Sequence, residues 1–273
     1  MSPNGSKPRP DAPLHPALSL LAAILGTAAM IVSAQLMARR WPFRITITIG
    51  SIMLAVPALL ALLLARRSIP GALALRPTDR RTALLAALLG AALWVASLGL
   101  LELQYTVWPP PPGYFEMFRT IHEALRPANV LDAMLSVLAI AAAPAAFEET
   151  LVRGVVLPSF RPALGATWAV LASALVFALM HADLYRLLFT FAVGVILGVV
   201  RLRGGALLPC ILVHATLNTL TFLLAPLVDD PGEKLPDPRP LLGAAMLAAG
   251  AAMTALLLRR LSRDRDGPPV PGL

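Results

Sequence analysis

The sequence predicts an all-α fold: a polytopic membrane helix bundle of about eight transmembrane helices with both termini in the cytoplasm. Of the 273 residues, 58% are hydrophobic and only 14% are charged, and the mean hydropathy is +0.75. These values lie far from those of ordinary globular chains. The hydrophobic residues also form runs long enough to cross a hydrocarbon core of about 30 Å. Finally, the Lys and Arg residues gather between alternate runs, as they do in membrane proteins.

Eight apolar runs predict the membrane helices. They cover residues 16–38, 45–65, 82–101, 129–156, 166–182, 184–200, 206–225 and 241–258. The fifth and sixth runs are separated only by HADLY, which is expected to form the turn between them. No internal repeat is visible, so the sequence gives no support to an inverted-repeat transporter.

The distribution of basic residues predicts the orientation. If the N-terminal tail, the second, fourth and sixth connections and the C-terminal tail share one side, that side holds 15 of the 23 Lys and Arg residues. This excess places both termini in the cytoplasm, with the chain in the cell membrane. The first connection, RRWPFR, is an exception because it places three arginines outside. Arginines on cytoplasmic loops account for the net charge of +8, so no nucleic-acid partner is predicted.

The chain divides into four parts. Residues 1–15 are predicted to be a disordered tail, and residues 16–127 to contain the N-terminal membrane helices and an interfacial loop. Residues 128–225 form a core with most of the intramembrane polar groups, and residues 226–273 a loop, the last helix and a cytoplasmic tail. Within the interfacial loop, WPPPPGYFEMFRTIHEALRP predicts a stiff proline segment and a short amphipathic helix. That helix lies on the membrane surface or, alternatively, forms a lid over a membrane cavity.

The segment FEETLVRG places charged residues in a strongly apolar neighbourhood. Ionised groups there cost several kcal/mol each unless they are paired or used. Glu149 and Arg153 are four residues apart and share a helix face, whereas Glu148 and Arg153 diverge by about 140°. Glu149 is therefore predicted to pair with Arg153, and Glu148 to be left available as a general base.

Further polar residues lie in later apolar runs. His181 follows Phe177 by four residues, and His214 and Asn218 share one helical face. Each alone is typical of a hydrogen bond between helices. Together with the glutamates and Arg153, they indicate a functional site.

The prolines and the helix lengths make this geometry testable. Pro158 is predicted to end the fourth helix and Pro144 to kink it. Glu148 and His214 then each lie about 13 Å above the cytoplasmic ends of their helices, whereas His181 lies about 25 Å above the cytoplasmic end of its own helix. His181 fits only if its helix is tilted, kinked or begins later. The GxxxG of Gly194 and Gly198 predicts close helix packing within the monomer.

Three motifs in order resemble one known family. EETLVR, FALMH and HATLN match Glu-Glu-x-x-x-Arg, Phe-x-x-x-His and His-x-x-x-Asn. This order on three hydrophobic helices resembles the CPBP family of intramembrane proteases, which includes the prenyl-protein (CAAX) endopeptidases and bacterial proteins related to bacteriocin immunity. The resemblance covers residues 129–224 and makes residues 128–225 a CPBP-like catalytic core.

The resemblance implies a role for each matched residue. Glu148 and His181 would activate a water molecule for attack on a scissile carbonyl, with Glu148 taking the proton. His214 and Asn218 would stabilise the oxyanion, a contribution of about 3 kcal/mol for each well-placed donor. The implied partners are a peptide or protein substrate, membrane-associated or lipidated, and the lipid bilayer.

The remaining motif residues, Glu149, Arg153 and Phe177, would contact the catalytic side chains and position them. Whether the site also holds a divalent metal such as zinc is left open, and Glu148, His181 and His214 are the candidate ligands. The sequence has no H-E-x-x-H motif, because HEALR places Arg126 where the second histidine would stand. Water activation without a metal is therefore favoured.

Two other classes of function are compatible with the polar cluster. A non-catalytic membrane scaffold or immunity protein could use it for binding, and a proton-coupled transporter could use it as a relay. The natural substrate and the oligomeric state are not determined by the sequence.

Overall fold

The structure is a computed structural model that describes residues 12–228 and 237–263. These residues form only helices and connections, which confirms the all-α fold. Most of the predicted tails at both ends and most of the polar loop before the last helix fall outside the described residues, although residues 12–15 of the N-terminal tail are described and lead directly into α1. The helices are α1 (Pro16–Met37), α2 (Phe43–Leu64), α3 (Ile69–Ala72), α4 (Arg80–Val107), α5 (Tyr114–Ala124), α6 (Val130–Val137), α7 (Ala143–Glu149), α8 (Leu157–Met180), α9 (Leu187–Gly204), α10 (Leu208–Val228) and α11 (Pro240–Arg263). Two π-helical segments, η1 (Leu138–Ala142) and η2 (Thr150–Val156), flank α7.

The protein is a multi-pass α-helical membrane protein. Within the described residues, six helical segments are long and apolar enough to cross a membrane, and the apolar part of α10, Leu208–Leu224, is a shorter seventh. The sequence predicted eight. The difference arises mainly because the fourth and fifth predicted spans belong to one helical run, Val130–Met180.

The prediction that Pro158 ends the fourth helix is wrong. The helical run passes through Pro158 and Pro162 and breaks at Gly165, whose φ of 75° and ψ of 172° are not helical. Pro158 stands at the start of α8, where the ladder changes from π to α and a residue without an N–H is tolerated. Gly165 is suited to the break because a positive φ costs glycine little.

The continuation of this helical run past Pro158 to Gly165 explains why the sequence placed His181 deeper than Glu148. Gly165 is 17 residues after Glu148 and 16 residues before His181, so the two arms of the hairpin are nearly equal. The eight residues from Leu157 to Gly165 rise by about 12 Å. That rise equals the difference between the depths predicted for His181 and for Glu148. The helix that carries His181 therefore starts farther out than the sequence prediction assumed.

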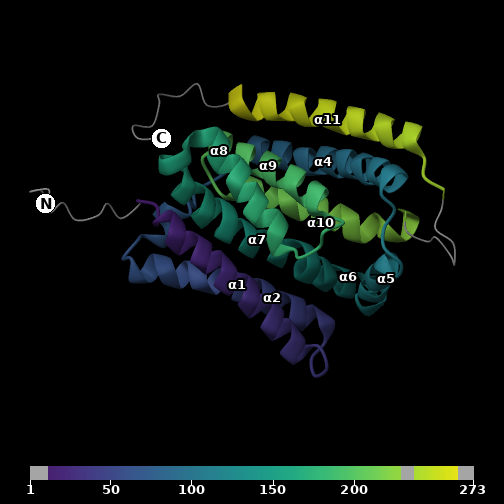
Figure 1. The fold of residues 1–273 in the computed structure, drawn as a ribbon, viewed down its shortest axis with the longest axis horizontal. Helices are drawn as coiled ribbons and strands as arrows, with labels where there is room; N and C mark the ends of the chain where they lie inside the picture. Colours follow the sequence, from purple (N-terminus) through teal and green to yellow (C-terminus); the bar gives the residue numbers. More distant parts are fainter. Residues whose placement is uncertain (1–11, 229–236, 264–273) are drawn as a thin grey trace, which may run out of the picture.

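The helices pack in three layers (Figure 1). The pair α1 and α2 lies on one side, the pair α4 and α11 on the other, and α7 to α10 fill the space between them. The start of α1 and the end of α11 lie at the same end of the bundle. The middle layer holds all of the polar residues singled out in the core.

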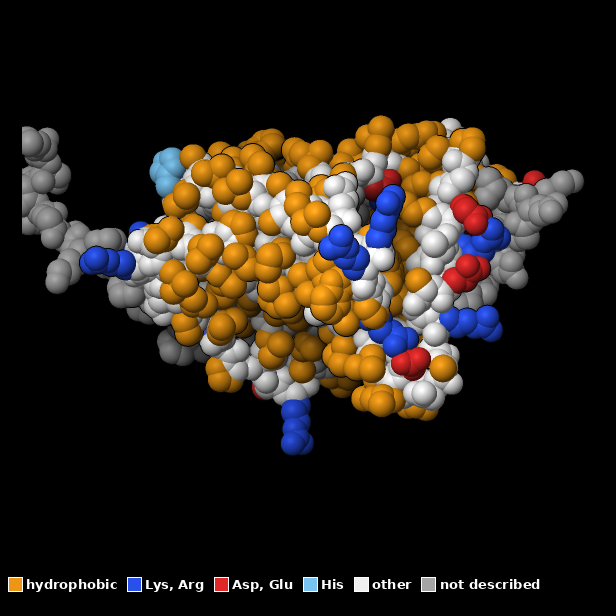
Figure 2. Space-filling model, turned by 90° about the horizontal axis from the view of Figure 1, so that it is seen from below, with side chains coloured by type: hydrophobic (Ala, Val, Ile, Leu, Met, Phe, Trp, Pro, Cys, Tyr) orange, Lys and Arg blue, Asp and Glu red, His pale blue; other side chains and the backbone are white. Residues whose placement is uncertain are grey.

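The outer surface is suited to lipid. Large apolar side chains of α1 and α2 are exposed, among them Ile24, Leu36 and Leu64. The face seen in Figure 2 is mostly hydrophobic, and charged side chains gather toward its right-hand end. Arg44, one of the arginines of the exceptional first connection, donates to Asp132 of α6 at 2.7 Å, so this residue has a structural partner.

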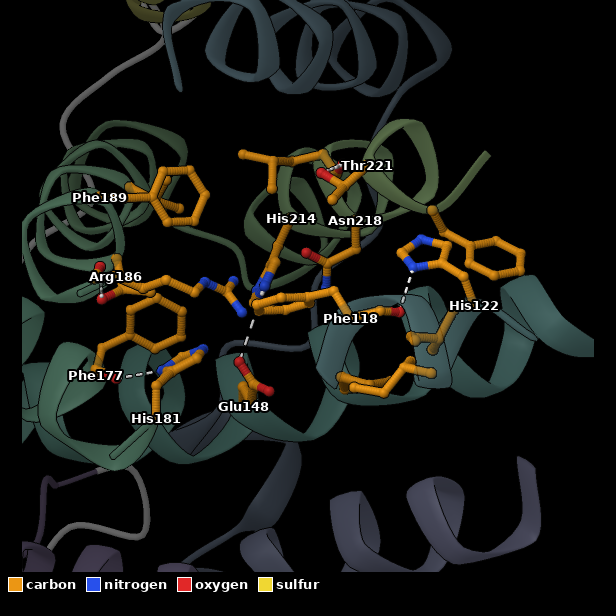
Figure 3. A pocket seen from close by; sticks show the side chains of 17 residues that line it. Phe118, His122, Glu148, Phe177, His181, Arg186, Phe189, His214, Asn218 and Thr221 are labelled. Atoms are coloured by element: carbon orange, nitrogen blue, oxygen red, sulfur yellow. Dashed lines mark hydrogen bonds and ion pairs between the residues drawn. The ribbon is translucent and has the colours of Figure 1, made fainter. Parts of the chain in front are cut away.

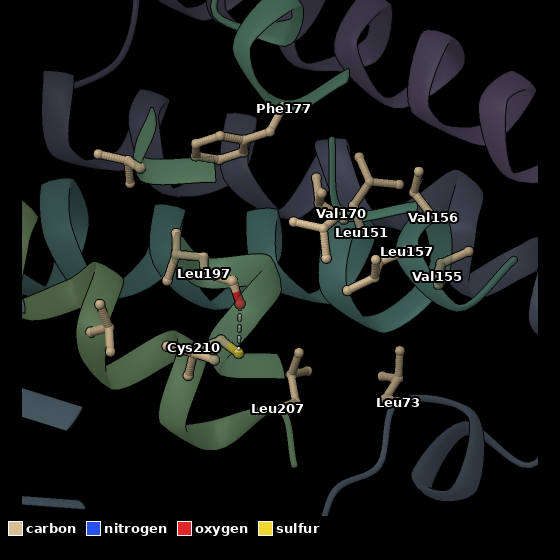
Figure 4. Packing of buried hydrophobic residues seen from close by; sticks show 14 of the residues in the cluster. Leu73, Leu151, Val155, Val156, Leu157, Val170, Phe177, Leu197, Leu207 and Cys210 are labelled. Atoms are coloured by element: carbon tan, nitrogen blue, oxygen red, sulfur yellow. Dashed lines mark hydrogen bonds between the residues drawn. The ribbon is translucent and has the colours of Figure 1, made fainter. Parts of the chain in front are cut away.

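The interior is close-packed with apolar and small side chains. Figure 4 shows Leu151, Val155 and Leu197 in the buried cluster, where the Cys210 thiol donates to the Leu197 carbonyl at 3.6 Å. The GxxxG prediction is confirmed within the monomer. A Cβ on Gly194 would lie 3.0 Å from Ala174 of α8, and a Cβ on Gly198 would lie 2.9 Å from Val170.

We expect Gly99→Ala to lower the free energy of unfolding by about 1–3 kcal/mol. Helix α11 packs so closely on α4 that a Cβ at Gly99 would lie 2.3 Å from the Leu247 backbone nitrogen. Denaturation in mixed detergent micelles measures the loss. The control is Gly204→Ala, whose new Cβ would have its nearest contact at 3.8 Å. Equal stability of the two variants would contradict the packing argument.

Candidate active site

Three helical elements bring the predicted site residues to one place. Glu148 is on α7, His181 follows the last residue of α8, and His214 and Asn218 are on α10. All four line a single cavity of about 240 Å³. Figure 3 shows the side chains of Glu148, His181 and His214 facing one another across it.

A buried ion pair underlies the site. Arg153 Nη1 donates to Glu149 Oε1 at 2.9 Å, and both side chains have no exposed surface. Arg153 Nη2 donates to the Gly194 carbonyl at 2.8 Å, which ties α9 to this pair. The predicted pairing of Glu149 with Arg153 is present. A buried charge of this kind is tolerated because it is paired and hydrogen-bonded.

The same carboxylate orients His214. His214 Nδ1 lies 2.9 Å from Glu149 Oε1, and because the carboxylate oxygen accepts, Nδ1 carries the proton. The other ring nitrogen, Nε2, is then directed at the cavity, 3.8 Å from Glu148 Oε2. Glu149 thus fixes the ring orientation of His214.

His181 is oriented in a similar way. Its Nδ1 donates to the Phe177 carbonyl at 2.8 Å, which leaves Nε2 as the free ring nitrogen. The Phe177 ring packs edge-on against His181 and His214, with centroid distances of 4.9 Å and 5.6 Å. Its face covers the Arg153 guanidinium at 4.5 Å. Phe177 therefore holds both histidines and the buried cation in place.

Glu148 and Asn218 present unused polar atoms. The Glu148 side chain is 16% exposed, and its Oε2 has no hydrogen-bond partner in the part of the chain that the structure describes. A buried carboxylate oxygen without a partner is rare in folded proteins and is typical of a functional group. Asn218 lines the cavity beside it.

Helix α5 covers one side of the cavity. Phe118, Ile121 and His122 of this helix are among the lining residues, together with Ile140 and Phe222. Helix α5 follows Gly113, whose φ is 77°. Of the two arrangements predicted for this amphipathic helix, the structure thus shows it over a cavity.

The start of α5 is fixed to the turn that follows His181. The Tyr114 hydroxyl donates to Asp183 Oδ2 at 2.8 Å, and the Tyr114 and Tyr185 rings pack at 4.9 Å. Burial and the hydrogen bond to Asp183 raise the pKa of the Tyr114 phenol, so it stays a donor at neutral pH. Gln104 Nε2 of α4 donates to the Tyr185 carbonyl at 2.6 Å. These contacts fix the position of the turn.

The site residues do not fit a zinc centre. Among the residues that the structure describes, no group of three or more His, Cys, Asp or Glu side chains is placed to hold a metal ion. The Nδ1 hydrogen bonds of His181 and His214 leave Nε2 of both rings available, as in metal-bound histidines, so the misfit lies in the spacing of the groups and not in these bonds. We therefore derive no step through a metal.

Two lining residues, Arg186 and His122, were not predicted from the sequence. Arg186 follows His181 by five residues, in the turn before α9. His122 was considered only as part of HEALR, and its ring stacks on Phe222 at 5.7 Å. For Arg186, a basic residue beside a motif histidine was the available signal. No sequence pattern indicated His122, because this residue reaches the cavity only through the packing of α5 over it.

The fold and the site together define a class of protein: a multi-pass membrane protein with a buried Glu/His cluster inside its helix bundle. Residues 130–220, about a third of the chain, match the family model of type II CAAX prenyl endopeptidase Rce1-like proteins. This part of the chain is an Rce1-like CAAX prenyl endopeptidase family domain. The searches of curated proteins and of solved structures gave no match.

Proposed function

We propose that the chain is an intramembrane endopeptidase that hydrolyses a peptide bond of a membrane-associated substrate. One observation carries the proposal: Glu148, His181, His214 and Asn218, from three helical elements, line one cavity in which Glu148 Oε2 has no hydrogen-bond partner among the described residues. The family description, a prenyl endopeptidase, supports the same chemistry.

Glu148 and His181 would activate water. A water molecule placed between them donates one proton to Glu148 and the other to His181 Nε2, which is the free ring nitrogen. As the oxygen attacks the scissile carbonyl carbon, the first proton passes to the Glu148 carboxylate. The protonated Glu148 then gives this proton to the leaving amine, so the carboxylate is regenerated when the C–N bond breaks.

His214 and Asn218 would stabilise the oxyanion. When its ring carries a proton on both nitrogens, His214 donates through Nε2, while its Nδ1 bond to Glu149 holds the ring in place. Asn218 lies one helical turn further along α10 and can donate its amide N–H to the same oxygen. Donors fixed by the fold act where charge develops in the transition state.

We propose further that both termini are cytoplasmic and that the chain lies in the cell membrane. The described ends lie at one end of the bundle (Figure 1), and the excess of basic residues falls on connections assigned to that end. The run Val130–Met180 would cross the membrane twice, with its reversal at Gly165, giving eight crossings in all. Cysteine-accessibility labelling at residues 5 and 268 on sealed cells tests the orientation.

We expect the detergent-purified protein to cleave members of a quenched fluorescent peptide library. Asn218→Ala should lower kcat by about 10²–10³-fold with little change in KM, because the lost donor acts only in the transition state. Thr219→Ala is the matched control, since its hydroxyl is bonded to the Ala215 carbonyl and it does not line the cavity. Absence of cleavage across a broad library would favour the scaffold function instead.

Treatment with a strong chelator distinguishes water activation by Glu148 and His181 alone from water activation that needs a metal. Because the described donors do not fit a metal, we expect the same rate of cleavage before and after the treatment. A rate that falls with chelator and returns with zinc would show that substrate or lipid rearranges Glu148, His181 and His214 into a metal site.

A further inference from the structure

The catalytic cavity contains a cation that the proposed mechanism does not use. Arg186 lines it together with Glu148, and no other Asp, Glu, Lys or Arg of the described residues is among its lining residues. Arg186 stands at the start of α9, in the turn that also carries His181. A residue this close to the reacting groups is in a position to contact a bound peptide.

The guanidinium of Arg186 has no anionic partner in the described structure. Arg44 is paired with Asp132, Arg119 with Glu116 and Arg153 with Glu149. For Arg186, by contrast, neither an ion pair nor a side-chain hydrogen bond occurs with any described residue. The residue is only partly buried, so its guanidinium is accessible to an anionic ligand that enters the cavity.

The nearest carboxylate in sequence is already occupied. Asp183 accepts from the Tyr114 hydroxyl at 2.8 Å and from the backbone N–H of Arg186 at 3.2 Å. These bonds hold Asp183 in the turn. They leave the Arg186 side chain free to extend into the cavity, where Figure 3 shows it reaching toward His214 and Glu148.

Two aromatic rings hold the guanidinium. The Arg186 Cζ atom lies 5.6 Å from the Phe118 ring centroid and 5.5 Å from that of Phe189. Such rings attract the cation through their faces but accept no strong hydrogen bond from its N–H groups. The N–H groups thus have no acceptor among the described side chains, and a planar guanidinium matches a carboxylate, which it can bind through two parallel hydrogen bonds.

We propose that Arg186 recognises a carboxylate of the substrate peptide close to the bond that is cleaved, an inference that rests on the proposed endopeptidase function. The carboxylate is either the C-terminus of the peptide or an Asp or Glu side chain. A cavity of about 240 Å³ with mostly apolar walls accommodates a few peptide residues and one such group. Glu148 in the same cavity disfavours more highly charged anions such as phosphate.

Matched peptides test the proposal. Cleaved members of the library are resynthesised with a free C-terminal carboxylate and as the C-terminal amide, and a second series of amides carries Asp or Glu in place of Asn or Gln at successive positions. For one of the two series, the wild-type protein should favour the acid over its neutral partner by about 10–100-fold in kcat/KM. The series that shows the preference identifies the source of the carboxylate.

The ratio of the two kcat/KM values separates recognition from structural support. Arg186→Gln should reduce this ratio to about one, whereas Arg186→Lys should retain part of it because it keeps the charge without the planar fork. A role confined to holding Phe118 and α5 would lower acid and neutral substrates equally and leave the ratio unchanged. Arg119→Gln removes an exposed arginine of α5 that does not line the cavity, and it should keep the wild-type ratio.

A binding measurement on the Glu148→Gln protein makes the inference independent of turnover. The probe is a pool of dansylated hexapeptides of Ala, Val, Leu and Phe, made once as acids and once as amides, together with an amide pool that contains Asp. Tighter binding of an acidic pool that disappears in the double variant with Arg186→Gln would support the carboxylate site even if no peptide were cleaved. Equal binding of acidic and neutral pools, or an acid preference that survives Arg186→Gln, would overturn it.

Discussion

Replacing Glu148 with Gln is expected to lower kcat for peptide hydrolysis by about 10³-fold or more while leaving the fold intact. Gln has the shape of Glu but cannot take a proton from water. Because Oε2 of Glu148 has no hydrogen-bond partner among the described residues, the substitution breaks no hydrogen bond on that atom and changes only its 3.8 Å contact with His214 Nε2. The free energy of unfolding should therefore change by less than about 0.5 kcal/mol.

Single-turnover cleavage by the wild type and the variant measures the effect, because it isolates the chemical step. Glu116→Gln is the control: it removes a carboxylate from the exposed pair with Arg119 on α5, outside the cavity, and should retain full activity. If Glu148→Gln kept more than about a tenth of the wild-type rate, Glu148 would not be the base. A stable but inactive variant would separate catalysis from the scaffold function, which needs the shape of the side chain and not its charge.

Helical periodicity was enough to predict the local pairing in this site. The spacing of four residues places Glu149 over Arg153, and the same rule places His214 and Asn218 on one face. Both follow from rotation about a single helix axis, so no knowledge of the neighbouring helices was needed. The all-α fold followed in the same way from the apolar runs.

The contacts between different helices could not be predicted from the sequence. The bond from His214 to Glu149 joins residues 65 positions apart, and it depends on how α10 packs against α7. Arg186 and His122 enter the cavity because of the turn after α8 and the docking of α5. The error at Pro158 has a local cause: the π-helical segment η2 shifts the hydrogen-bond register, and a sequence pattern does not show such a shift.

The second large effect is expected from Arg153→Met, which should lower the free energy of unfolding by about 3–5 kcal/mol. Met resembles the arginine side chain in its unbranched shape but removes the cation beside Glu149, which has no exposed surface. The Glu149 carboxylate would keep only its bond to His214, and the Gly194 carbonyl would lose its donor. Unfolding in mixed detergent micelles measures the difference, with Arg119→Met as the control for loss of an exposed pair, which should cost less than about 1 kcal/mol.

The double variant Glu149→Gln with Arg153→Met decides whether the uncompensated charge is the cause. If it is, removing both charges should restore part of the lost stability, because no buried carboxylate is left without its cation. Activity should not return with stability, since His214 would then lack the carboxylate that orients its ring. A double variant less stable than Arg153→Met alone would mean that Glu149 stabilises the fold mainly through His214. In that case, the main role of the ion pair would be to hold the Glu149 carboxylate in place for His214.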